Sequence, residues 1–228
     1  MRTVAALLAI PLALVAWQWW GDRSAEHVLT PIAAGIAGRP VEVQCQTLWG
    51  ALLDAQSRQG EVFFDSRGVP EAKLFLTHTT CKRLSAFAKA STHEELDCLA
   101  DVDWSDRVPL RPDSECYRRA SPTVYALLIL AHEAYHTAGV RGEATANCYA
   151  IQALAWAAAR LGAPEHEAHV VAQAMAALEP FQNDEYASSE CVPGSRLDLH
   201  PETPEFPTEQ PLRPPLGRGG MPGLAYAA

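Results

Sequence analysis

Apolar residues dominate a long stretch near the middle of the chain, residues 122–138, which contains no glycine. Ser121 and Pro122 precede this stretch, and Gly139 follows it. Serine is a good helix N-cap, proline suits the first helical position, and glycine commonly follows the last turn. The pattern therefore predicts a helix that begins at Pro122 and ends before Gly139.

Other parts of the chain show either helical or strand patterns. Two β-rich runs, residues 61–65 and 73–77, are separated by a segment with Gly68 and Pro70, which predicts a hairpin or two strands of a small sheet. Apolar residues recur at helical spacing elsewhere. Helices are predicted over residues 43–56, from 79 or 80 to about 91, from 143 to 156 and from 164 to 178. The fold class is therefore α+β, helix-rich, with a small sheet or hairpin.

Two segments show neither pattern. Residues 92–106 are acidic, and His93 stands directly before Glu94 and Glu95. Adjacent positions on a helix point apart, so a solvated acidic turn is preferred to a cluster of metal ligands. Residues 108–119 are predicted to be a loop held by Cys116.

The N-terminal segment is apolar over residues 4–20 and is preceded by Arg2. Its length is at the short end for crossing a bilayer, and three tryptophans lie at its far end. Residues 1–21 are predicted to anchor the protein in the cell membrane, with the rest of the chain outside the cytoplasm. Cleavage as a signal peptide, which would release a secreted protein, is the alternative.

Composition gives the remaining boundaries. Glycines and a proline mark residues 22–40 as a connector, and the proline-rich residues 195–228 are predicted to be a disordered tail. The domain itself would span residues 41–194. Three apolar residues near the connector could pack on that domain: Ile32, Ile36 and Val41.

With 48% hydrophobic residues, the 228-residue chain can bury one ordinary core. The net charge of −9 and the absence of a large basic cluster argue against nucleic acid as a partner. The six cysteines show no C-x-x-C spacing, which argues against a zinc knuckle. Outside the cytosol, this even number predicts three disulfides.

The candidate chemistry lies on the central helix, at His132, Glu133 and His136. Two histidines four residues apart share one helix face and can hold one Zn²⁺, while Glu133 can reach a metal-bound water as general base. The simpler interpretation is a helix with a polar face that carries two histidines by chance. Burying such groups without a partner is costly, which favours a metal.

Catalytic zinc usually takes three protein ligands. The predicted third ligand is Glu143, because Gly139 and Gly142 let the chain reverse before the next helix. His166 and His169 are the other contenders, although a polar helix face explains them more simply.

These residues resemble the H-E-x-x-H zinc metallopeptidases, in particular the gluzincins, in which a glutamate on the next helix completes the zinc site. Residues 143–150 are similar to the E-x-x-A-[D/N]-C-[Y/F]-A segment of small bacterial neutral zinc metallopeptidases. The resemblance covers roughly residues 121–155. It implies a zincin-like domain and an edge strand that an extended substrate can join. The chain departs from metzincins, which would place a third ligand at Gly142, and its linker to Glu143 is shorter than in large gluzincins.

Several other roles follow from this hypothesis. Asn147 would either orient a ligand or be an ordinary surface amide. Tyr135 is predicted to pack away from the ligands, and a disulfide between Cys148 and Cys191 would hold the C-terminal loop across the site. The donor to the reaction's oxyanion is left open among five residues: Tyr149, Tyr186, Arg141, His166 and His169.

The sequence therefore predicts an extracytoplasmic zinc metallopeptidase that hydrolyses peptide or protein substrates by a zinc-activated water, with Glu133 as general base. A non-catalytic exported protein that uses the same scaffold for binding or assembly is the alternative from another class. Zinc-dependent hydrolysis of a non-peptide amide would use the same residues.

Overall fold

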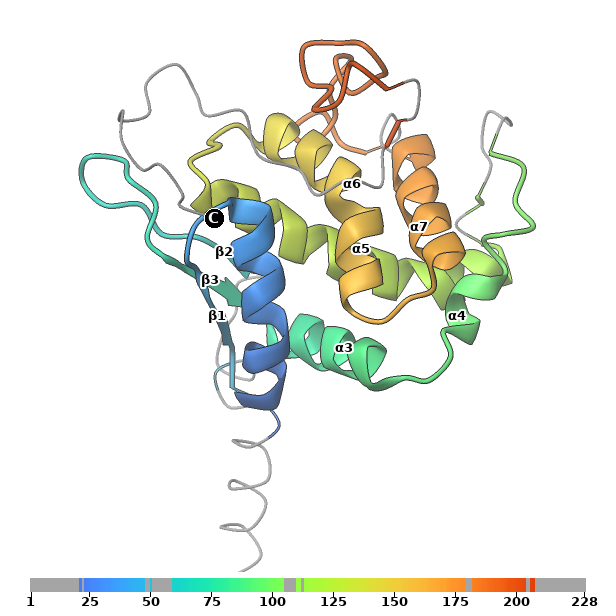
Figure 1. Ribbon diagram of the computed structural model, residues 1–228, viewed down its shortest axis with the longest axis horizontal. Coiled ribbons are helices and arrows are strands. Elements are labelled where there is room, and N and C mark those ends of the chain that lie inside the picture. The colour runs from blue at the N-terminus through green and yellow to red at the C-terminus, as the bar shows by residue number, and fades with distance from the viewer. Residues whose placement is uncertain are drawn as a thin grey trace, which may run out of the picture.

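A three-stranded sheet lies beside a group of packed helices, so the fold is α+β and helix-rich as predicted (Figure 1). The computed structural model describes residues 21, 23–47, 50, 59–104, 110–111, 113–178, 182–203 and 206–207. The predicted anchor, apart from residue 21, lies outside them. So do most of the predicted helix over residues 43–56 and residues 208–228 of the predicted tail. Within the described ranges, no helix is both long and apolar enough to cross a membrane.

The sheet has the strand order β1-β3-β2. Strands β1 (Glu42–Cys45) and β3 (Lys73–Leu76) are parallel, whereas β2 (Gly60–Glu61) pairs with β3 in the antiparallel sense. The prediction of a hairpin or two strands of a small sheet over residues 61–65 and 73–77 is confirmed for β3, whereas β2 is shorter than its run and shares only Glu61 with it. The prediction of a helix from residue 43 was wrong, because Val43 and Cys45 alternate with more exposed residues and pair with β3 as a strand.

Residues 23–37, within the predicted connector, form a helix that lies beside the sheet (Figure 1). Ile32, Ile36 and Val41 are buried, as predicted. A methyl group on Gly35 would lie 2.5 Å from the Trp156 ring. The helix therefore approaches the rest of the core closely at this glycine.

The remaining helices pack around one long central helix, α5 (Glu115–Thr137). Helix α6 (Glu143–Arg160) crosses it and contacts α7 (Glu165–Leu178), both close to their predicted positions. Helix α3 (His78–Lys89) is capped by the side chain of Thr77, a few residues before the predicted start. A short helix, α4 (Glu94–Asp97), follows it.

Helix α5 begins at Glu115 and not at Pro122, so the loop predicted over residues 108–119 was wrong at its end. The hydroxyl of Ser114 accepts a hydrogen bond from the Tyr117 N–H at 3.1 Å and caps the helix. The Cys98–Cys116 disulfide fastens its first turn. This cap and crosslink stabilise the turns of α5 that precede Pro122. The helix continues through Pro122 although proline lacks an N–H and is unfavourable inside a helix.

Three disulfides join segments far apart in the chain, as the cysteine count predicts. Cys45–Cys81 links β1 to α3, and the predicted Cys148–Cys191 bridge links α6 to the C-terminal segment. Part of the predicted tail packs on α6, because Leu197 is buried and its carbonyl accepts a hydrogen bond from the Gln152 amide at 2.8 Å.

The acidic turn around His93 differs from its prediction. Glu94 is exposed, but His93 is only 2% exposed and its ring lies 4.0 Å from that of Phe87. The imidazole ring has an apolar face, which packs on Phe87. His93 is therefore part of the packing between α3 and α4 and is not solvated as predicted.

The position of Pro122 inside α5 yields a test of the fold. We expect Pro122→Ala to stabilise the disulfide-bonded protein by about 1–2 kcal/mol, because alanine supplies the N–H that the carbonyl of Arg118 lacks. Chemical denaturation would measure the change. Ser121→Ala is the matched control and should give a smaller gain, since Ser121 already has its N–H. A loss of stability in Pro122→Ala would contradict the helix as described.

Candidate metal centre

Two histidine rings lie on one buried face of α5. His132 and His136 are 7% and 6% exposed, and their rings meet edge to face with centroids 4.5 Å apart. Their Nε2 atoms are 2.9 Å apart. The four-residue spacing therefore brings two imidazole nitrogens to the same point, as the sequence predicts.

The end of α5 orients His136. Gly139 has a φ of +95°, and the N–H groups of Gly139 and Val140 donate to the carbonyls of His136 and Tyr135. This glycine-dependent ending places the Val140 carbonyl 2.6 Å from His136 Nδ1. A carbonyl oxygen can only accept, so Nδ1 carries the hydrogen and Nε2 keeps its lone pair.

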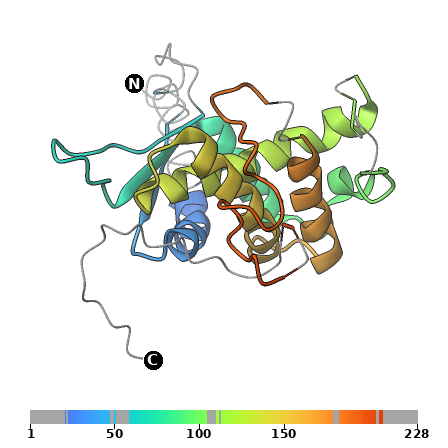
Figure 2. The ribbon, with the colours of Figure 1, turned by 90° about the horizontal axis from the view of Figure 1, so that it is seen from above.

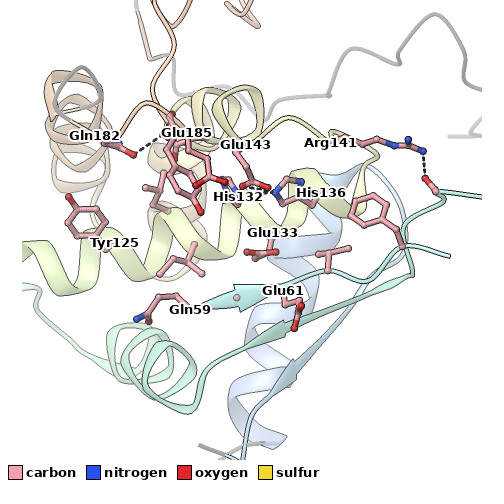
Figure 3. Close-up of a pocket in the computed structure, with 18 residues that line it drawn as sticks. Gln59, Glu61, Tyr125, His132, Glu133, His136, Arg141, Glu143, Gln182 and Glu185 are labelled. Carbon is pink, nitrogen blue, oxygen red and sulfur yellow. Dashed lines mark hydrogen bonds and ion pairs between the residues drawn. The ribbon is translucent and has the colours of Figure 1, made fainter. Parts of the chain in front are cut away.

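Glu143 completes the group from the first position of α6. Its Oε2 lies 3.0 Å from His132 Nε2 and 3.4 Å from His136 Nε2 (Figure 3). The possible ligand atoms of these three residues all lie within 4.8 Å of one another. His132, His136 and Glu143 could therefore bind a metal ion.

The donor atoms fit a divalent cation. Ligands about 2.0–2.1 Å from a tetrahedral zinc ion lie about 3.3 Å from one another, close to the separations found here. Burial, reinforced by the nearby His136 ring, lowers the pKa of His132 to about 4, so the His132 ring is neutral at pH 7. The two Nε2 atoms and Glu143 Oε2 then lie close together, and the only hydrogen that they can share is one on His132 Nε2. A cation would satisfy all three.

Glu133 follows His132 on α5, and its side chain points toward β2 (Figure 3). It is only 8% exposed. A methyl group on Gly60 would lie 2.6 Å from Glu133 Cγ, so β2 can pass this close only because residue 60 has no side chain. Gly60 is not among the site residues predicted from the sequence, although a glycine before a β-rich run can indicate close backbone approach.

These groups face a cavity of about 840 Å³. Of the five predicted oxyanion donors, Tyr186 and Arg141 line it, whereas Tyr149, His166 and His169 are not among its lining residues. Tyr149 packs against Tyr135, and His169 is hydrogen-bonded to Gln173 on α7. Several other residues that line the cavity carry no local signal that would mark them in the sequence: Gln59, Phe64, Tyr125, Gln182 and Glu185.

Neither role predicted for Asn147 matches the structure: it is only 2% exposed and so not a surface amide, and its side-chain N–H groups donate to Gln182 and Tyr186 and not to a candidate ligand. Its Nδ2 donates to Gln182 Oε1 at 3.1 Å and to the Tyr186 carbonyl at 2.9 Å. It thus holds the C-terminal segment, and the Tyr186 ring lies 5.8 Å from that of His132. The disulfide at Cys148 fastens the same segment beside this contact.

Comparisons with protein-family models, with curated proteins and with solved structures found no match for this chain.

The metal centre can be tested without reference to activity. Replacing His132, His136 or Glu143 by alanine should each weaken metal binding by more than about a hundredfold, since loss of an outer-sphere partner alone costs about 10–100-fold. Competition with a chromophoric chelator would measure the affinity, and elemental analysis the stoichiometry. His169→Ala is the control and should bind as the wild type does. Equal losses in all four variants would contradict the proposed ligand set.

Proposed function

We propose that this chain is a zinc-dependent metallopeptidase. The observation that carries the proposal is the convergence of His132, His136 and Glu143 inside a cavity, with the Glu133 carboxylate beside them. Two imidazoles and one carboxylate suit zinc, and three protein ligands leave a fourth position for water or substrate.

The chemistry divides between the ion and the chain. Zinc bound here would polarise a substrate carbonyl and lower the pKa of water. Glu133 accepts the proton of the attacking water and transfers it to the leaving amine. Its carboxylate is suited to this role because α5 and the backbone at Gly60 confine it beside the ligands.

Tyr186 is the strongest candidate for a donor to the oxyanion. Arg141 also lines the cavity, but its guanidinium donates to the Gly68 carbonyl. Tyr186 lies against His132 and is held by Asn147. A phenolic O–H beside the ligands can stabilise developing negative charge on the substrate oxygen.

An extended peptide suits the sheet beside the site. Strand β2 is at an edge of the sheet, and residues 59–62 line the cavity. A peptide that adds to this edge would bring a backbone carbonyl next to Glu133. The three disulfides support a location outside the cytosol, where such bonds persist.

Glu133→Gln tests the proposal. The variant should retain one zinc ion and lose about 10²–10⁴-fold in peptide hydrolysis, because the amide keeps the shape of the side chain but cannot accept the proton. A peptide-library cleavage assay beside metal analysis would measure both. A zinc-loaded wild type that cleaves no peptide would contradict the proposal and favour a binding protein on the same scaffold.

Gly60→Ala tests the contact between β2 and Glu133. The added methyl group must displace Glu133 at Cγ, so we expect kcat to fall by about 10–100-fold with unchanged zinc affinity. Steady-state kinetics with a cleaved library peptide would show the effect. Gly21→Ala is the control, since a methyl group there would meet nothing within 4 Å and Gly21 does not line the cavity. Equal kcat values in the two variants would exclude a role for the close approach.

A further inference from the structure

The segment that connects β2 to β3 projects from the body of the protein (Figures 1 and 2). It carries Phe63, Phe64 and Val69, which are 46%, 39% and 47% exposed, and we call residues 62–71 the apolar hairpin. Within the described part of the chain, one other large hydrophobic residue, Val192, is as exposed. Exposed apolar residues gathered in one place commonly mark a binding surface.

Hydrogen bonds give the apolar hairpin a defined shape. The Asp65 N–H donates to the Val69 carbonyl at 2.9 Å, and the Glu71 N–H donates to the Phe63 carbonyl at 2.8 Å. The Asp65 carboxylate accepts from the Val69 N–H at 2.9 Å. The positive φ of Gly68, +74°, allows the turn. The apolar side chains are therefore presented on an ordered support.

The hairpin is also fastened to the candidate metal centre. The Arg141 guanidinium donates to the Gly68 carbonyl (Figure 3), and Arg141 lies two residues before the ligand Glu143. Phe64 and Gly68 line the cavity that contains the histidine pair. Phe64 is thus the exposed apolar residue that joins the hairpin to the cavity, whereas the Phe63 ring lies edge to face on Phe75, with centroids 5.4 Å apart.

The number of residues between Gly60 and Phe64 gives the distance from Glu133 to the apolar hairpin. Gly60 lies against Glu133, and Phe64 is four residues further along the chain. At about 3.3 Å per residue, this is about 13 Å in an extended strand. A peptide that adds to β2 in the antiparallel sense would reach Phe64 with residues on the amino side of the bond beside Glu133.

We propose that the apolar hairpin is a docking surface for the substrate, which selects an aliphatic or aromatic residue three to five positions before the cleaved bond. This inference depends on the proposed function. A protein segment fits better than a bilayer, because the turn between the apolar residues carries Asp65, Ser66 and Arg67. These charged and polar groups would have to enter the membrane together with the apolar side chains.

Cleavage-site profiling of the zinc-loaded full chain with randomised 14-residue peptides tests the proposal. The wild type should enrich Leu, Ile, Val or Phe three to five residues before the cleaved bond. Phe64→Ser should abolish this preference and lower kcat/KM by about tenfold for a peptide with leucine there, with no change for its serine counterpart. Val69→Ser should act in the same direction. Val192→Ser is the matched control, equally exposed, and should behave as the wild type does.

A binding assay separates this inference from the proposed function. Zinc-loaded Glu133→Gln should bind the leucine peptide about tenfold more tightly than the serine peptide, and adding Phe64→Ser should remove the difference. This result would support the docking surface even if no variant cleaved a peptide. Equal binding of both peptides would overturn it. So would loss of sedimentation with phosphatidylcholine–phosphatidylglycerol vesicles in Phe64→Ser without any change in peptide binding.

Discussion

Three electron-rich atoms meet at the wall of the cavity, two from buried histidines and one from the partly exposed Glu143, and their meeting constrains much of the structure around it. His132 and His136 Nε2 and Glu143 Oε2 lie 2.9–3.4 Å from one another. Such a group is unfavourable without a cation, because there are too few N–H donors among the three atoms to satisfy their lone pairs. The helix ending at Gly139 serves this arrangement twice, since it both reverses the chain to Glu143 and places the Val140 carbonyl on His136.

The surrounding contacts hold the elements that meet at the site. One disulfide fastens the first turn of α5, another joins β1 to α3, and the third holds the C-terminal segment on α6. Asn147 and Gln152 add hydrogen bonds to that segment. Disulfides add stability that a small three-stranded sheet does not supply. The Cys148–Cys191 bridge and the hydrogen bonds of Asn147 also limit the movement of Tyr186 relative to His132.

Local patterns account for the predictions that agree with the structure. The i, i+4 histidines, the glycine at the end of α5 and the start of α6 at Glu143 each depend on neighbours within a few residues. Errors arose where distant contacts outweighed a local signal, and the early start of α5 also depends on a local signal that the prediction overlooked, the Ser114 cap. Ser114 and the Cys98–Cys116 bridge carried α5 past Pro122, and pairing with β3 made a strand of residues 42–45. His93 became buried because the Phe87 ring lies over it.

The sequence alone determined that His132 and His136 would share a helix face, and it favoured Glu143 over His166 and His169 as the third residue, since a short turn leaves little freedom between His136 and Glu143. Only the tertiary structure decided what faces them. Gly60 meets Glu133, Arg141 holds Gly68, and Asn147 holds the segment with Tyr186. Each of these contacts joins residues dozens of positions apart, and no local pattern of residues specifies such a pairing, because it depends on how the whole core packs.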